Sequence, residues 1–312
     1  MFGGLKSLFR FGRLTEEDFR REQERILTKI PVPVFWLFGK TGSGKTSIVR
    51  YLTGAADAEI GLGFRPQTRF SRQYDFPDAG HPVARFLDTR GLGESRYDPA
   101  EDIAEFDRSA HMVLVTARVM DHALAGVVEP LRAIRKAKPD RPIVLALTCL
   151  HEAHPGEQHP EPDPFTQSLL PDGISESLRR SIERQRERFE GLADHVVPID
   201  LTRTEEGFDE PDFGGERLKQ TLLDVLPAAY RRTLRDFDEA MRPLKDLNER
   251  RATPYIIGYS SMAATAAAVP VPWVDIPVVM AIQSHLVYKL ATLYGQEVRT
   301  SVVSQMVGAA GG

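Results

Sequence analysis

The chain has 312 residues, 42% hydrophobic and 27% charged, a composition that supports a full buried core and about two domains. The net charge of −4 gives no overall attraction to nucleic acid, and this excludes binding through a uniformly basic surface. With one cysteine, Cys149, the chain cannot form an internal disulfide, which agrees with a reducing, cytoplasmic compartment.

Residues 1–30 are predicted to form a separate N-terminal helical segment. Up to Leu14 its apolar and aromatic residues can share one side of a helix, with lysine and arginine nearby, as in helices that lie on a membrane surface. The alternative is a short helix docked on the protein itself, or a frayed terminus. Thr15–Asp18 then has the pattern of a capping box, which predicts a charged helix that ends before Pro31.

The strongest signal is a strand, a glycine loop and a helix in direct succession. The apolar run Val34–Phe38 ends in Gly-x-x-x-x-Gly-Lys-Thr, and the amphipathic run Ser47–Leu52 comes next. This pattern is the phosphate-binding P-loop, in which backbone N–H groups and the helix N-terminus converge on a phosphate. Lys45 would reach the β- and γ-phosphates, and the Thr46 hydroxyl would ligate Mg²⁺. The predicted nucleotide-binding residues here are Gly39, Lys40, Thr41, Gly42, Ser43, Gly44, Lys45 and Thr46.

The next two strands are predicted to run antiparallel to each other. Residues 70–76 carry aromatic side chains at even spacing, which is typical of a half-buried strand, and Val83–Leu87 is the second strand. A short turn at Asp78–Gly80 joins them, and strands joined in this way are antiparallel. The second strand leads into Asp88-Thr89-Arg90-Gly91. An acidic residue at the end of a buried strand is what a Mg²⁺–nucleotide site needs.

The order of three motifs, the P-loop, Thr68 and Asp88-x-x-Gly91, resembles the small Era-like GTPases of the translation-factor-related class. The resemblance covers residues 31–227 and implies a GTPase domain with an α/β P-loop NTPase fold, a mostly parallel doubly wound sheet with one antiparallel strand. It implies that Asp88 holds Mg²⁺ through water, that Thr68 joins the metal, and that the Gly91 amide meets the γ-phosphate. The implied cofactors are GTP or GDP and Mg²⁺, with Thr46, Thr68 and Asp88 as metal ligands.

Alternating helices and strands are predicted for the rest of this domain. The predicted helices cover residues 97–108, 127–138, 175–192 and 218–226, and the predicted strands cover 112–119, 143–148 and 196–199.

Base recognition in the resembled family uses Asn/Thr-Lys-x-Asp, and this chain has Thr148-Cys149-Leu150-His151 at that position. Thr148 matches, whereas His151 replaces the aspartate that accepts two hydrogen bonds from guanine. Glu152 could take this role if the loop shifts, and Asp200 opens the loop whose backbone meets the base in the family. The missing aspartate leaves open that the chain is a P-loop protein that uses ATP.

Three histidines, His151, His154 and His159, lie in a proline-rich loop after this motif. His-Glu-Ala-His is one residue short of the zinc-protease helix motif, and Pro155 would break a helix behind it. An inserted loop near the base is therefore favoured over a metal site.

Residues 228–312 are predicted to form an apolar helical domain. A charged helix with an apolar stripe is predicted at 228–251, and Thr253–Val274 contains no charged residue. Prolines at 270 and 272 divide the apolar region into two legs, the first about 22 Å long against roughly 30 Å of hydrocarbon. A peripheral or soluble arrangement is therefore favoured over a membrane hairpin. The legs also resemble a C-terminal domain of unknown function attached to some bacterial Era-like GTPases, and the abrupt end at Gly308–Gly312 suggests a fragment of a longer chain.

These motifs predict a Mg²⁺-dependent GTPase that acts as a nucleotide-controlled switch, with residues 228–312 facing a membrane surface or a protein partner. Leu92 stands where many GTPases have a water-orienting glutamine, so unassisted turnover should be slow, on the order of 10⁻³ s⁻¹ or less. The alternatives are a membrane-remodelling GTPase activated by homo-oligomer assembly and the ATP-using protein; nucleic acid is not indicated. The candidate catalytic residues are Lys45, Thr68, Arg90 and Gly91, with Arg65 and Arg69 as further arginines.

Overall fold

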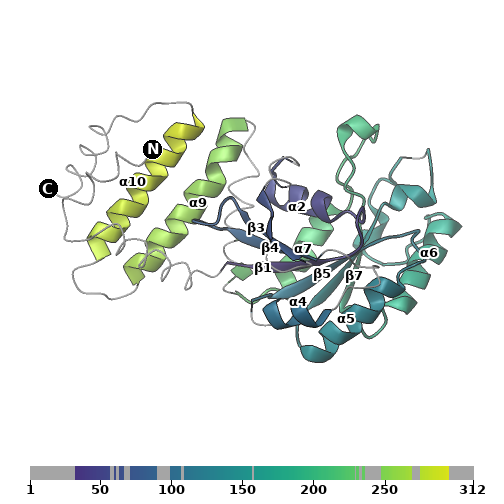
Figure 1. The fold of residues 1–312 in the computed structure, drawn as a ribbon. Helices are drawn as coiled ribbons and strands as arrows, with labels where there is room; N and C mark the ends of the chain where they lie inside the picture. The colour runs from purple at the N-terminus through teal and green to yellow at the C-terminus, as the bar shows by residue number, and fades with distance from the viewer. Residues whose placement is uncertain are drawn as a thin grey trace. The chain divides into compact units, whose positions relative to one another are not determined.

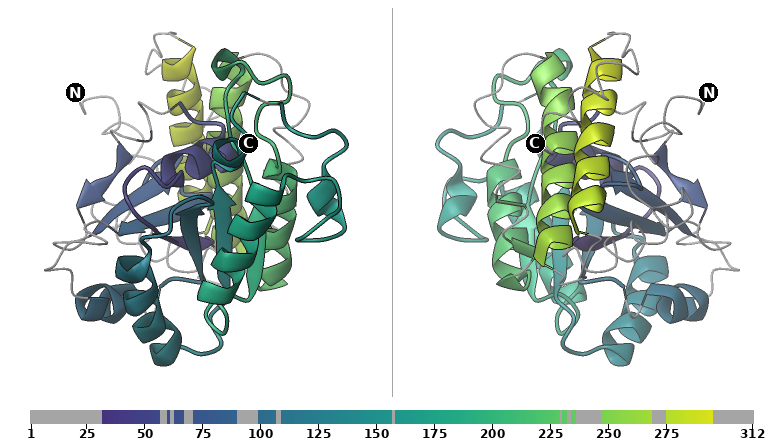
Figure 2. Two further views of the ribbon diagram at one scale, coloured as in Figure 1. Left: turned by 90° about the vertical axis from the view of Figure 1, so that its right-hand side faces the viewer. Right: turned by 90° about the vertical axis from the view of Figure 1, so that its left-hand side faces the viewer.

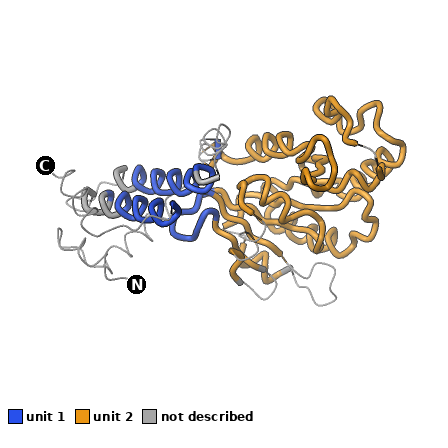
Figure 3. Tube along the Cα trace, turned by 90° about the horizontal axis from the view of Figure 1, so that it is seen from above, with its two compact units in different colours: residues 1–32, 76–83, 232–312 blue, residues 33–75, 84–231 orange. Residues whose placement is uncertain are grey.

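The computed structural model describes residues 32–56, 60, 63–66, 71–89, 99–106, 109–156, 158–228, 230–231, 234–235, 247–268 and 275–294. The chain divides into two compact units (Figure 3). The larger unit consists of residues 33–75 and 84–231, and the other of residues 1–32, 76–83 and 232–312. The predicted N-terminal helical segment lies outside the described residues.

In the described residues, a seven-stranded sheet with the order β2-β3-β4-β1-β5-β6-β7 forms the centre of the larger unit (Figure 1). Strands β4, β1, β5, β6 and β7 run parallel, and β3 runs antiparallel to its neighbour β2. The predicted α/β fold with a mostly parallel sheet and one antiparallel strand is confirmed. The strands are β1 (Val34–Phe38), β2 (Arg65–Pro66), β3 (Ser71–Phe76), β4 (Ala84–Thr89), β5 (Met112–Arg118), β6 (Ile143–Thr148) and β7 (His195–Pro198).

Helices cover both faces of this sheet (Figures 1 and 2). On one face, α4 (Pro99–Phe106), α5 (Ala125–Ala137) and α6 (Glu176–Arg188) contribute side chains to one buried cluster with the strands. On the other face, α2 (Lys45–Thr53) meets α7 (Gly215–Val225), where the Tyr51 hydroxyl donates to Glu216 Oε1 at 2.7 Å. The central parallel strands are apolar along almost their whole length because both faces are covered.

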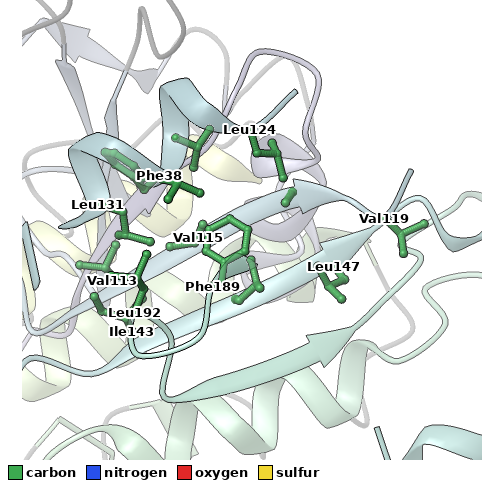
Figure 4. Close-up of a cluster of buried hydrophobic side chains, with 14 of the residues drawn as sticks. Phe38, Val113, Val115, Val119, Leu124, Leu131, Ile143, Leu147, Phe189 and Leu192 are labelled. Atoms are coloured by element: carbon green, nitrogen blue, oxygen red, sulfur yellow. The ribbon is translucent and has the colours of Figure 1, made fainter. Parts of the chain in front are cut away.

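The core under α4, α5 and α6 consists of alternate residues of neighbouring strands, because successive strand side chains point to opposite faces (Figure 4). Trp36 is fully buried there and packs edge-on against Phe38 and Phe106. Its indole Nε1 donates to Thr89 Oγ1 at 2.7 Å, so the one polar atom of this large side chain is paired inside the core.

The short strand β2 is absent from the sequence-based prediction, which treats residues 54–67 as a connection. Two residues are too few to show a period, and Pro66 lacks the N–H that a central strand needs. Its place at the end of the strand order is where proline is tolerated.

In the smaller unit, the described helices α9 (Leu247–Ala268) and α10 (Asp275–Leu293) lie side by side (Figure 3). α9 runs through Pro254 without a break, so the end of the predicted charged helix and the first apolar leg belong to one helix, which corrects that prediction. The Thr253 hydroxyl donates to the Glu249 carbonyl at 2.8 Å beside this proline. Within the described part of the chain, no helix combines the length and the apolar character needed to cross a bilayer.

A polar cluster forms around the buried rings of His81 and Tyr259 within the same unit. The His81 ring stacks on Tyr259 with ring centroids 3.4 Å apart, and His285 meets both rings edge-on. Asp78 lies 3.4 Å from His81 Nδ1 and 3.4 Å from Lys289 Nζ. Burial raises the pKa of the Asp78 carboxyl, but the hydrogen bond from His81 and the charges of His81 and Lys289 outweigh it and lower the pKa to about 2.

Replacing Trp36 with phenylalanine should destabilise the larger unit. The change removes the donor to Thr89 and leaves a void in the core, so the free energy of unfolding should fall by about 1–3 kcal/mol in urea titrations. Arg132→Ala, on an exposed part of α5, is the control and should change it by less than about 0.5 kcal/mol. An effect of Trp36→Phe no larger than that of the control would contradict this account of the core.

Candidate functional site

The loop between β1 and α2 has the backbone of a phosphate cradle. Gly42 and Gly44 have φ angles of 75° and 89°, in the left-handed region that favours glycine. α2 begins at Lys45, directly after this turn, so the first N–H groups of the helix have no partner within it. Loop and helix N-terminus together can offer backbone donors and a partial positive charge to an anion.

Hydroxyl groups from β5 and β6 fix this loop to the sheet. The Ser43 hydroxyl donates to the Lys40 carbonyl at 2.7 Å and lies 2.5 Å from Thr116 Oγ1. Since the Ser43 proton is used, Thr116 is the donor in the second bond. Thr148 Oγ1 donates to the Ser43 carbonyl at 3.1 Å. Thr116 was missed by the sequence analysis because it lies inside a strand recognised only from its apolar run.

Lys45, Asp88 and Arg72 meet beside this loop. Lys45 Nζ donates to the carbonyls of Gly39 and Lys40 at 2.6 and 2.8 Å, and lies 3.8 Å from Asp88 Oδ1. Arg72 Nη2 donates to Asp88 Oδ2 at 3.2 Å. Burial lowers the pKa of the Lys45 ammonium, the Asp88 charge opposes this shift, and Arg72 adds to it. Among the described residues, two cations thus face one carboxylate, an arrangement that suits a polyphosphate.

The structure describes only some of the other residues predicted to hold phosphate and metal, and these lie in different surroundings. Thr41 and Thr46 are exposed on the loop and the first turn of α2. The Lys40 ammonium instead donates to Asp121 Oδ2 at 2.7 Å. Thr68, Arg90 and Gly91 lie outside the described residues, as do Arg69 and Leu92.

The donor chemistry of this site fits Mg²⁺. The Thr46 hydroxyl and the Asp88 carboxylate are oxygen donors, the type that Mg²⁺ prefers. Among the described residues, no group of three or more His, Cys, Asp or Glu side chains could hold a metal. Mg²⁺ commonly binds through one or two protein oxygens together with phosphate and water.

The predicted base-recognition residues make polar contacts with other groups of the chain. The His151 backbone N–H donates to Asp200 Oδ2 at 2.7 Å, and His151 Nδ1 lies 2.8 Å from the same oxygen and 3.0 Å from Oδ1. Asp200 is 2% exposed, so its carboxylate is buried against this histidine. Glu152 pairs with Arg118, and Thr148 is buried with its hydroxyl on the P-loop. The contact between His151 and Asp200 joins loops after β6 and β7, and sequence spacing did not reveal it.

The other loop histidines pack as aromatic rings. His159 lies between Phe208 and Phe213, with ring centroids 4.6 and 4.7 Å away. Burial lowers its pKa, although the charge of Asp200 acts in the opposite direction. His154 is also buried, and its ring meets His159 edge-on. In this loop the histidine rings therefore pack against one another and against phenylalanine rings.

The strand, glycine loop, helix and sheet-edge aspartate place the chain in the class of α/β proteins with a P-loop NTPase fold. No protein-family model and no curated protein matches the sequence.

Solved structures match part of the chain. One, described as a probable GTP-binding protein engB, is 16% identical, with 62% of this chain and 97% of that chain covered and a TM-score of 0.38. Toc33 from Arabidopsis thaliana, in complex with Mg²⁺ and GMPPNP, is 18% identical over 72% of this chain and 96% of its own, with a TM-score of 0.36. A bacterial selenocysteine-specific elongation factor, EF-Sec, is 20% identical with a TM-score of 0.37; the match covers 62% of this chain but only 28% of the factor's length. The assignment of the site therefore rests on the chain's own loop geometry.

Replacing Gly39 with alanine should disable the loop. A Cβ atom at this position would overlap both the hydroxyl and the carbonyl oxygen of Thr116. We expect the affinity for a nucleoside triphosphate to fall at least about tenfold, and the free energy of unfolding by about 1–3 kcal/mol. Adding Thr116→Ala should not restore binding, because the carbonyl remains. Wild-type affinity in Gly39→Ala, measured by fluorescent nucleotide titration, would contradict this packing.

Proposed function

We propose that the chain binds GTP with Mg²⁺ and hydrolyses it to GDP and phosphate, acting as a nucleotide-controlled switch. The observation that carries the proposal is the position of Lys45, between the glycine loop and Asp88. A half-buried lysine held on two loop carbonyls, with a carboxylate 3.8 Å away, is the arrangement expected of a site for a metal-bound polyphosphate.

In this proposal, each group has a defined role. The loop amides and the Lys45 ammonium bind the β- and γ-phosphates and stabilise the negative charge that builds up on their oxygens. Thr46 and Asp88 hold Mg²⁺, which when bound supplies further neutralisation of that charge. The buried hydroxyls of Thr116 and Thr148 act indirectly, since they keep the loop in place before the nucleotide arrives.

The switch itself is proposed for residues outside the described part of the chain. Thr68 and Gly91 would contact the γ-phosphate only while it is present, so their loops would change after hydrolysis. Residues 228–312 would report that state to a membrane surface or a protein partner. With Leu92 after the glycine, turnover without a partner or self-assembly should be slow.

A second candidate, an ATP-using protein, is favoured by the contact between His151 and Asp200. Both oxygens of this buried carboxylate face His151, whereas guanine recognition in the resembled family needs a carboxylate with two free acceptor oxygens. A neutral imidazole offers the base at most one acceptor.

Side-by-side titration with labelled GTP and ATP separates the two candidates, and the first predicts tighter binding of GTP. The double variant His151→Asp/Asp200→Asn should raise the ratio of GTP affinity to ATP affinity at least about tenfold. The new aspartate at position 151 supplies two carboxylate oxygens that can accept hydrogen bonds from guanine. The asparagine at position 200 can still accept a hydrogen bond from the backbone N–H of residue 151. If the wild type bound ATP more tightly than GTP, the nucleotide in the proposal would be ATP.

Lys45→Ala tests the proposal as a whole. Loss of the ammonium should remove measurable triphosphate binding in calorimetric titrations with excess Mg²⁺, because no other lysine is placed on the loop carbonyls of the described residues. Lys219→Ala, on α7, removes a lysine that pairs with Glu216 and should retain wild-type affinity. Wild-type affinity in Lys45→Ala would refute the role of this lysine.

A further inference from the structure

The antiparallel direction of β3 brings its first residues to the phosphate end of the sheet. β1 and β4 run parallel and end where the glycine loop and Asp88 lie. β3 is the neighbour of β4, and the connection between them is closed by the Val83 N–H, which donates to the Phe76 carbonyl at 2.7 Å, so β3 runs in the opposite direction and begins at that end of the sheet. Arg72 is the second residue of β3 and pairs in register with Pro66 of β2. Its position at the site thus results from strand direction and not from any motif.

Among the described residues, the neighbours of the Arg72 guanidinium use only part of its hydrogen-bonding capacity. Nη2 donates to Asp88 Oδ2 at 3.2 Å, and the guanidinium carbon lies 5.1 Å from the centroid of the Phe64 ring. The buried Nε has no hydrogen-bond partner among the described residues. A guanidinium has five donor hydrogens in a rigid fork, so one carboxylate contact and one aromatic face leave capacity for a further anion.

The charges around Asp88 favour a change in the partner of Arg72, from this carboxylate to a phosphate. The carboxylate is 9% exposed and faces Lys45 on one oxygen and Arg72 on the other. A divalent ion bound by the same carboxylate would stand next to the guanidinium, and two such cations repel each other strongly in a partly buried site. A triphosphate supplies the negative charge that would draw the guanidinium away from the carboxylate.

We propose that Arg72 pairs with Asp88 while the site is free of nucleotide and moves to the terminal phosphate when a Mg²⁺-bound nucleoside triphosphate engages Asp88. The inference rests on the proposed function and adds to it a phosphate-contacting residue from the beginning of β3. It predicts that Arg72 distinguishes triphosphate from diphosphate, because only the former has the terminal group that the fork can grip.

The experiment measures affinities for a fluorescent non-hydrolysable GTP analogue and for fluorescent GDP, with excess Mg²⁺ and with Mg²⁺ chelated. With Mg²⁺, Arg72→Gln should weaken binding of the triphosphate analogue at least about tenfold and binding of GDP less than about threefold. Without Mg²⁺ the arginine stays on Asp88, so Arg72→Gln and the wild type should agree within about twofold. Arg72→Lys keeps the positive charge but lacks the planar guanidinium. With Mg²⁺, its affinity for the triphosphate analogue should lie between those of the wild type and Arg72→Gln.

Arg85→Gln is the matched control, because Arg85 lies on β4 and pairs with Asp75 at 2.6 Å in the same region of the sheet. It should leave both affinities within about twofold of wild type. An equal loss for triphosphate and diphosphate, an unchanged triphosphate affinity, or a loss that persists without Mg²⁺ would each overturn the exchange. Should Arg72→Gln fail to fold in thermal melts, Arg72→Lys decides by the same criteria. A wild-type chain that binds neither nucleotide would instead refute the proposed function.

Discussion

Two threonine hydroxyls, from β5 and β6, hold the glycine loop against the end of the sheet, and the rest of the site depends on them. Thr116 and Thr148 both act on Ser43, one on its hydroxyl and one on its carbonyl. With Ser43 fixed, Gly42 and Gly44 turn the chain in the left-handed region, and α2 starts with its free N–H groups at the loop. The phosphate cradle is thus formed before any ligand binds, which reduces the ordering cost of binding.

Charge at the site is organised around one buried carboxylate. Asp88 lies within ion-pair distance of both Lys45 and Arg72, while Lys45 is also tied to two loop carbonyls. Removing the ligand therefore leaves no isolated buried charge, which would be costly. Within the described part of the site, the same arrangement sets two cations against one carboxylate, which favours an anion. The site can be stable when empty and still attract a polyphosphate.

The sequence could predict those residues of the site that belong to short motifs within the chain. The P-loop is recognisable from the spacing of its strand, loop and helix, and Asp88 from its place directly after a buried strand. Arg72 and Thr116 could not be found in this way, since their roles depend on which strands are neighbours and in which direction they run. The pairing of His151 with Asp200 likewise joins two separate loops. The charged helix predicted to end at Arg251 and the first apolar leg were treated as separate because their compositions differ, whereas α9 joins them in one helix.

The most direct test of the central claim is the response of individual backbone amides to nucleotide, measured by nuclear magnetic resonance on the deuterated chain. The account predicts that saturating Mg²⁺ and a non-hydrolysable GTP analogue shift the amide resonances of Gly39 to Thr46 more than those elsewhere in the sheet domain, because these N–H groups bind the phosphates. Unchanged resonances for these residues, at nucleotide concentrations that shift signals in other parts of the chain, would contradict it.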